Sequence, residues 1–211
     1  MKISILLPYK ENFSPIYAGA VSLFVKDTTK ISKYKKNITI FGSTNLKRIF
    51  NLNYKNINLK KNLIQSGSKI YVKEFLKFEK ELPSDIIEIH NRPNYFHLIN
   101  KFKKKQKIVL YFHNDPLSMT GSRSVTDRKD LLENATKIIF NSHWSRKRFL
   151  EGINLLHINS EKMNVIYQST SIKKVNLKSK KKWITFVGKL NRAKGYDLFG
   201  KAVLKILKKY K

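Results

Sequence analysis

Polar residues that could take part in chemistry follow two apolar runs of this sequence. The first run is followed by His90, Asn91, Arg92 and Pro93, and the second by His113, Asn114, Asp115 and Pro116. A histidine at the end of a strand projects its imidazole where it accepts a hydroxyl proton or hydrogen-bonds a sugar. We therefore predict a functional role for His113 and an anionic ligand for Arg92. The alternative is a turn in which Asn114 and Asp115 accept local backbone N–H groups.

A third candidate is the basic loop from Gly188 to Gly195, which carries Lys189, Arg192 and Lys194. A diphosphate at the N-terminus of the following helix would be held by backbone N–H groups and by these cations. Gly19 opens an earlier helix, where a small residue lets the backbone approach a phosphate. The alternatives are one more basic loop in a lysine-rich chain and ordinary helix–sheet packing at a glycine.

Several other chemistries lack their motifs in this sequence. No Cys is present, which excludes disulfides, thiolate zinc sites and Cys nucleophiles. The five His residues show neither H-x-x-x-H nor H-E-x-x-H spacing, and no Asp-x-Asp occurs. The sequence also lacks G-x-G-x-x-G, the phosphate-binding G-x-x-x-x-G-K-[ST] and G-x-S-x-G. We expect no metal and no cofactor.

The elements that must position these residues alternate between short β-rich runs and longer amphipathic runs. The expected strands are residues 2–7, 37–41, 85–89, 107–112, 137–140 and 163–167. The expected helices are residues 16–32, 68–81, 95–104, 128–135 and 142–150, the last capped by Ser142. Residues 44–67 are ambiguous. This alternation predicts an α/β fold with a largely parallel sheet, in which polar strand ends converge on one edge.

The pattern divides the chain into a large domain and the opening of a second one. Residues 1–170 form the first domain, and the polar, lysine-rich residues 171–181 form a linker. Residues 182–211 begin a second domain with a strand at 183–187 and a helix from residue 196 onward. One strand and one helix cannot bury their own apolar faces. We therefore expect the remainder of this second domain to be missing.

The formal net charge of +30 comes mainly from lysine, since only seven of the 44 basic residues are arginine. Nucleic-acid recognition surfaces favour arginine interleaved with aromatic residues, whereas lysine is spread here through nearly every loop and helix. We interpret the charge as a solvated surface that attracts phosphate-bearing partners or anionic lipid headgroups. The alternative is a basic nucleic-acid-binding or membrane-surface-docking module without catalysis.

No segment has the length of a membrane span. The longest apolar runs, residues 3–7 and 108–112, are far shorter than the roughly 20 residues that cross a bilayer. The first run is also too short for a signal peptide, so we expect the mature protein to begin at Met1. We expect a cytoplasmic protein, with peripheral contact at the inner face of the membrane as an addition.

Four segments resemble glycosyltransferase family 4, the retaining sugar transferases with the GT-B fold. They are residues 85–93 (DIIEIHNRP), 107–116 (KIVLYFHNDP), 137–149 (KIIFNSHWSRKRF) and 184–198 (ITFVGKLNRAKGYDL), which occur in family order. The last segment is similar to the family's G-[RK]-L-x-x-x-K-G opening of the nucleotide-sugar-binding domain. The resemblance implies two Rossmann-like domains, with the acceptor bound by the first, the nucleotide sugar by the second and the active site between them.

By this resemblance, Lys189 and Lys194 contact the donor diphosphate and stabilise the leaving nucleoside diphosphate without a metal. Lys189 stands where the family more often has Arg, which replaces a bidentate grip by a point charge. His113 lies beside the reacting sugar, and Gly19 lies near the diphosphate. Asn91, Arg92, Asn114 and Asp115 border the acceptor cleft.

The resemblance also implies the partners. They are a nucleotide-sugar donor and a glycan or lipid-linked acceptor, as in polysaccharide biosynthesis, and no specific nucleic acid is expected. The family's acidic E-x7-E-type motif lies downstream of the residues present here, so the donor pocket is incomplete. We expect the 211-residue chain to transfer sugar poorly and its full-length parent to transfer it well.

Overall fold

The computed structural model describes residues 1–59, 66–154, 159–169, 181, 183–188 and 190–209. The chain divides into two compact units, Met1–Ser169 and Thr170–Lys211. Almost all of the expected linker at 171–181 lies outside the described residues.

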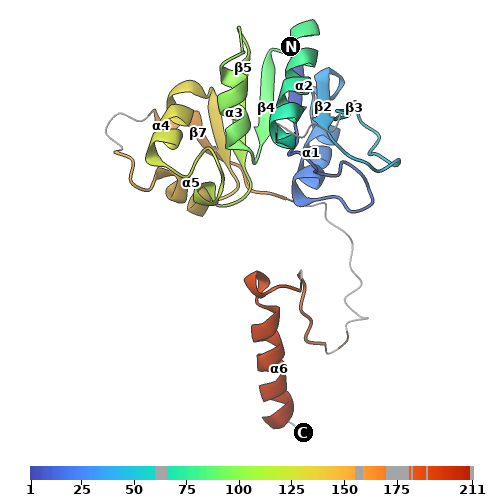
Figure 1. Cartoon of the computed structure of the whole chain (residues 1–211). Helices are drawn as coiled ribbons and strands as arrows, with labels where there is room; N and C mark the ends of the chain where they lie inside the picture. Colours follow the sequence, from blue (N-terminus) through green and yellow to red (C-terminus); the bar gives the residue numbers. More distant parts are fainter. Residues whose placement is uncertain (60–65, 155–158, 170–180, 182, 189, 210–211) are drawn as a thin grey trace. The chain divides into compact units, whose positions relative to one another are not determined.

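The first unit is built on one seven-stranded sheet in the order β3-β2-β1-β4-β5-β6-β7, and every neighbouring pair is parallel (Figure 1). The strands are β1 (Ile3–Leu6), β2 (Ile38–Gly42), β3 (Tyr54–Asn56), β4 (Ile86–His90), β5 (Lys107–Phe112), β6 (Lys137–Phe140) and β7 (Met163–Val165). The predicted α/β fold with a parallel, Rossmann-like sheet is confirmed. The ambiguous stretch at residues 44–67 contains β3 at the sheet edge.

Five helices connect these strands. They are α1 (Ala20–Ile31), α2 (Gly67–Glu81), α3 (Pro93–Asn100), α4 (Val125–Asn134) and α5 (His143–Leu150). The predicted cap of α5 is confirmed, because the Ser142 side chain accepts a hydrogen bond from Ser145 N at 3.1 Å. The helix expected at 16–32 begins only at Ala20, after a loop that contains Pro15. No helix in the described part of the chain is long and apolar enough to cross a membrane.

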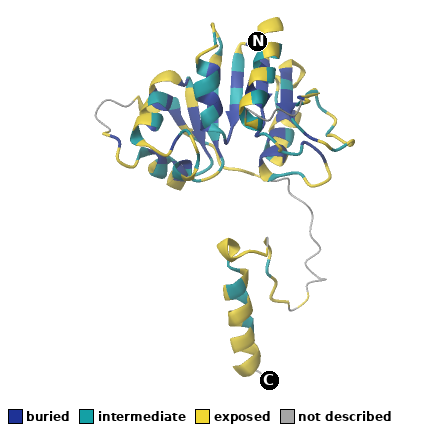
Figure 2. Ribbon diagram, viewed as in Figure 1, coloured by how far each residue is buried: buried dark blue, intermediate teal, exposed yellow. Residues whose placement is uncertain are grey.

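The two faces of the sheet carry separate apolar cores, because side chains alternate along each strand. In β1, Ile5 packs with Val21 and Val25 of α1, whereas Leu6 belongs to the cluster formed by α2, α3, α4 and α5 on the other face. Right-handed connections place α1 on one face and α2 to α5 on the other, because the strand order runs both ways from β1. Figure 2 shows the buried strands in the centre and the exposed outer sides of the helices.

The loop between β5 and α4 is packed onto the start of α3. Its Gly121 has φ +91°, and a Cβ on this residue would lie 2.5 Å from Asn94 N. His97 of α3 fixes the same loop, with Nε2 2.9 Å from the Gly121 carbonyl oxygen and Nδ1 2.7 Å from Asp130 Oδ2. These two contacts join the β5–α4 loop and α4 to α3.

The second unit contains α6 (Tyr196–Lys209), preceded by a 3₁₀ turn at Arg192–Lys194. The strand expected at residues 183–187 is not formed. A strand requires a partner for its backbone N–H and C=O groups, and no strand is assigned among the described residues of this unit. Phe186 instead packs against Phe199 of α6, with 5.5 Å between ring centroids.

Substitution of Gly121 tests how tightly the β5–α4 loop is held against α3. We expect Gly121→Ala to lower the unfolding free energy by about 3 kcal/mol, because left-handed strain and overpacking each cost about 1–3 kcal/mol. Gly152→Ala is the matched control, since Gly152 also has positive φ but its added Cβ would meet only Val125 Cγ2 at 3.3 Å. Urea unfolding measures both variants. Equal losses for the two variants would show that the contact with Asn94 does not constrain the loop.

Candidate functional site

The candidate site lies at the carboxyl edge of the sheet, where the strand order reverses. In the sheet, β1 has β2 on one side and β4 on the other, so the connections that follow β1 and β4 lead to opposite faces. In open α/β sheets this reversal leaves a crevice in which ligands bind. His90 is the last residue of β4, and His113 follows the last residue of β5. The structure thus brings together His90 and His113, the first residues of the two polar clusters that the sequence singled out.

The centre of the site is a pair of stacked histidines. His90 Nδ1 lies 2.9 Å from His113 Nε2, and the ring centroids are 5.2 Å apart. His90 is 1% exposed, so its hydrogen bond is almost fully shielded from solvent. The second nitrogen of His113, Nδ1, lies 2.6 Å from Nε2 of Gln168. Both ring nitrogens of His113 are therefore engaged by protein groups.

These contacts fix the positions of the ring protons. The amide nitrogen of Gln168 only donates, so Nδ1 of His113 accepts and its ring proton is assigned to Nε2. Nε2 then donates to His90 Nδ1, which assigns the proton of His90 to its own Nε2. That nitrogen has no hydrogen-bond partner among the described residues and lies 3.7 Å from Glu88 Oε2. The result is a chain of donors and acceptors that runs from Gln168 through His113 to His90.

Apolar and aromatic groups surround the histidine pair. Phe24 of α1 meets the His113 ring edge-on at 5.0 Å, and Tyr111 stacks on His90 at 4.6 Å. Burial, together with repulsion from His90, lowers the pKa of His113 to about 3. Burial also raises the pKa of Tyr111 above its ordinary value. At neutral pH His113 is thus a neutral imidazole whose Nδ1 becomes available to a ligand hydroxyl when Gln168 moves away.

Asn91 holds the ends of β4 and β5 together. It is 4% exposed and has φ +56°, a left-handed conformation that Asn adopts more readily than most residues. Its backbone N donates to the Tyr111 carbonyl oxygen at 2.7 Å, and its Oδ1 accepts from His113 N at 3.3 Å. Asn91 therefore sets the backbone position of His113. Arg92 follows it and lines a polar cavity to which Asn91 also contributes.

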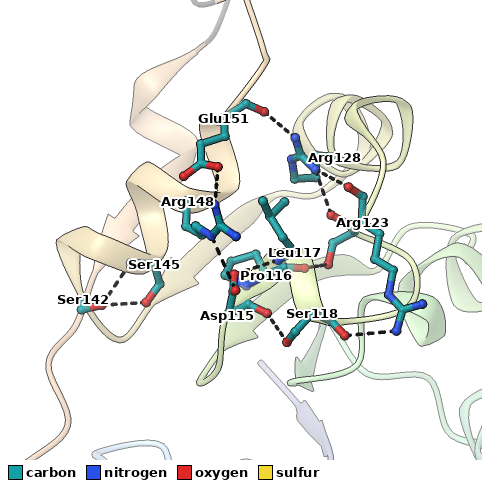
Figure 3. Close-up of polar contacts among 11 residues, drawn as sticks. Asp115, Pro116, Leu117, Ser118, Arg123, Arg128, Ser142, Ser145, Arg148 and Glu151 are labelled. Atoms are coloured by element: carbon teal, nitrogen blue, oxygen red, sulfur yellow. Dashed lines mark hydrogen bonds and ion pairs between the residues drawn. The ribbon is translucent and has the colours of Figure 1, made fainter.

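Asp115 is engaged within its own turn. Its Oδ1 accepts from Leu117 N at 3.0 Å, and its Oδ2 lies 3.5 Å from Arg148 Nε (Figure 3). These contacts correspond to the turn that the sequence left open as an alternative for Asp115. Asn114 is exposed at the tip of this turn.

The same loop is anchored by a buried guanidinium. Arg128 is 2% exposed and donates to three backbone carbonyl oxygens (Figure 3). Two of them lie in the β5–α4 loop and one lies in the residue that follows α5. The carbonyls belong to Ser122, Arg123 and Glu151. Buried arginine bonded in this way fixes the backbone of the β5–α4 loop.

The N-terminus of α1 is occupied by a carboxylate of this chain. Gly19 precedes α1 and makes no side-chain cap, and a Cβ at this position would overlap Glu11 Oε1. The same oxygen accepts from Ser22 N at 3.2 Å. A negative charge at a helix N-terminus is favourable. Glu11 thus sits where the sequence predicted that a phosphate would approach Gly19.

Lys194 belongs to the second unit, where it closes the 3₁₀ turn before α6 and is exposed. Gly188 lies beside it, since a Cβ at Gly188 would be 3.9 Å from Lys194 Cβ. Lys189 lies outside the described residues. Proximity of these lysines to His113 stays a prediction.

Sequence reasoning did not assign roles to four residues of this site: Glu11, Glu88, His90 and Gln168. Glu88 and His90 carry a detectable signal, because two polar residues at i and i+2 of an otherwise apolar strand share one face. Glu11 and Gln168 carry none, because each acts on a residue that the fold brings close. Gln168 lies 55 positions from its partner His113.

Comparison with known proteins identifies the type of fold. No protein-family model matches this sequence, and no curated protein matches it. Among solved structures, Anabaena Alr3699/HepE in complex with UDP and glucose has a TM-score of 0.55 and 16% identity, covering 81% of this chain and 45% of that one. Sucrose-phosphate synthase from Thermosynechococcus elongatus has a TM-score of 0.55 and 11% identity, covering 81% of this chain and 49% of that one.

This chain spans about half the length of both proteins. A second structure of the synthase, with a TM-score of 0.51 and 10% identity, is covered over 90% of its length. These neighbours are GT-B glycosyltransferases. The first unit therefore has the Rossmann-like α/β fold found in enzymes of that type.

The lowered pKa of His113 predicts how stability depends on pH. Between pH 6.5 and about 3 the unfolded chain binds a proton at this residue and the folded chain does not. Stability is therefore lost as the pH falls through this window, by at most about 1.4 kcal/mol per pH unit for one proton. We expect His113→Gln to lose less unfolding free energy than the wild type between pH 7 and pH 4.5. Urea midpoints at both pH values, with exposed His143→Gln as the control, check this, and parallel losses in all three proteins would contradict it.

Proposed function

We propose that this chain forms the acceptor side and the beginning of the donor side of a family 4-type glycosyltransferase. The reaction moves a sugar from a nucleotide sugar to a glycan or a lipid-linked acceptor. The observation that carries the proposal is the hydrogen-bonded His113–His90 pair, with His113 neutral at pH 7, at the strand-order reversal of a GT-B-like fold. One structure with this fold is HepE in complex with UDP-glucose, at a TM-score of 0.50, 15% identity and coverage of 78% of this chain and 43% of that one.

The residues divide the reaction between them. The bond between the anomeric carbon and the diphosphate oxygen breaks, the acceptor oxygen bonds to that carbon, and the acceptor hydroxyl proton leaves with the diphosphate. Configuration is retained. His113 orients the reacting sugar by hydrogen bonding, while Lys189 and Lys194 stabilise the charge on the leaving diphosphate without a metal. Gly19 lets the backbone of α1 approach the same diphosphate.

The domains follow this division in the proposal. Residues 1–170 bind the acceptor, 171–181 link the domains, and 182–211 begin the nucleotide-sugar-binding domain. Asn91, Arg92, Asn114 and Asp115 border the acceptor side. A lipid-linked acceptor gives the lysine-rich surface a use, since each basic residue near an anionic bilayer adds about 1 kcal/mol to peripheral binding. The enzyme then works in polysaccharide biosynthesis, at the cytoplasmic face of the membrane.

Binding of UDP, followed by calorimetry, tests the donor side. We expect Lys194→Gln to weaken binding at least tenfold, because a hydrogen bond to a charged group contributes about 1.5–3 kcal/mol. Lys201→Gln is the matched control, since Lys201 is an exposed lysine of α6 outside the basic loop. Equal effects of the two substitutions would show that the lysines attract UDP only through the overall net charge. This result would contradict the assignment of Lys194 to the diphosphate. Absence of UDP binding by the wild-type chain would show that the basic loop and Gly19 do not form a diphosphate site within these 211 residues.

Glu11 gives a second test of the diphosphate site. If the phosphates approach Gly19, the Glu11 carboxylate must leave or repel them, so we expect Glu11→Gln to strengthen UDP binding two- to fivefold. This corresponds to about 0.3–1 kcal/mol, the usual effect of one charge at a helix N-terminus. Glu81→Gln is the control, because Glu81 is exposed at the far end of α2. An equal gain in UDP affinity for Glu81→Gln would show that the effect comes from net charge. It would contradict the proposal that the diphosphate lies near Gly19.

A further inference from the structure

We infer that the cavity lined by Arg92 binds an anionic group, phosphate or carboxylate, of the acceptor sugar. This inference rests on the proposed function, which it deepens by naming the class of acceptor. The cavity has a volume of about 270 Å³ and is lined by Ser68, Asn91, Arg92, Asn94, Ser118 and Thr120, among others. None of the described residues that line it is acidic.

The first argument is that Arg92 has no carboxylate partner among the described residues. Its guanidinium is half-buried, its Nη1 donates to the Asn91 carbonyl oxygen at 2.7 Å, and it also bonds the Tyr95 hydroxyl. In the described part of the chain it forms no ion pair with a carboxylate, whereas Arg148 contacts both Asp115 and Glu151. A guanidinium has five N–H donors and favours planar anions such as carboxylate and phosphate. Arg92 thus retains donors for a ligand.

The size and rigidity of the cavity are the second argument. Its volume lies just below the roughly 300–1,000 Å³ of sites for drug-sized ligands, which fits one sugar-sized group. One wall is the β5–α4 loop, which Gly121 and His97 hold against α3. Two other lining residues, Ser68 and Arg92, contact Tyr95, whose hydroxyl accepts from Tyr9 N at 3.0 Å. A cavity held on both sides spends little binding energy on ordering its own side chains.

The link to the histidine pair is the third argument. Asn91 lines the cavity and at the same time accepts the backbone hydrogen bond of His113. An anion bound to Arg92 is therefore separated from His113 by one side chain. In the proposal, a sugar whose charged group occupies the cavity places its hydroxyl groups near the imidazole that orients the reacting sugar.

An NMR titration tests the inference with three probes: glucose 6-phosphate, glucuronate and methyl glucoside. At 150 mM salt we expect one or both charged sugars to bind at least tenfold more tightly than methyl glucoside, with shifts at Asn94 and Thr120. The arm that binds more tightly identifies the anion as phosphate or carboxylate. Arg92→Gln should abolish this preference and Arg92→Lys should retain part of it. Arg48→Gln, which removes an equal charge at an exposed loop position, should retain all of it.

Two outcomes would overturn the inference. The first is equal weakening by Arg92→Gln and Arg48→Gln, which would show attraction by net charge only. The second is equal affinity for the charged and neutral sugars. Thermal melting and UDP affinity of Arg92→Gln are measured alongside. If this variant is folded, binds UDP normally and still prefers charged sugars, the anion site at Arg92 is refuted while the proposed function stands. Absence of UDP binding by the wild-type chain contradicts the diphosphate site of the proposed function and leaves the sugar titration interpretable.

Discussion

The hydrogen bond between His90 and His113 is the interaction on which the rest of the site depends. It joins the carboxyl ends of β4 and β5 at 2.9 Å, in a place that solvent hardly reaches. Within this pair one ring nitrogen must donate and the other must accept, since an unmade hydrogen bond in a poorly hydrated setting is costly. Together with burial, this contact keeps His113 neutral at pH 7, and Gln168 contacts the second ring nitrogen.

Two groups of the protein lie where the proposed ligands would bind. Gln168 occupies Nδ1 of His113, and the Glu11 carboxylate occupies the N-terminus of α1. In both cases a polar group that would otherwise lack a partner is satisfied by a residue of the connecting segments rather than of the strands or helices. Each ligand therefore exchanges one hydrogen bond for another instead of filling an unsatisfied site, which limits the net gain in affinity and increases the importance of geometry.

Local patterns explain what could be predicted from the sequence. Apolar alternation and Ser142 were sufficient for the parallel α/β fold and the α5 cap, and a histidine after an apolar run was sufficient to place His113 at a strand end. The strand at 183–187 was wrong because apolar composition does not report whether a pairing partner is present. The contacts of Glu11 and Gln168 could not be predicted, since they depend on which distant segments the fold brings together.

Because the net charge is high, selectivity for one anionic ligand depends on how far the binding cation is buried. Exposed lysines attract any anion, and salt at physiological ionic strength screens them beyond about 8 Å. Arg92 is only half exposed and is held by backbone contacts, so its charge acts at one fixed point and is screened less. Most of the described acidic groups near the site are already engaged, as Asp115 is with Arg148 and Glu11 is with α1. In a chain this basic, a ligand is therefore distinguished from the surrounding ions only where a cation is partly buried, lacks a carboxylate partner and faces a cavity of matching size.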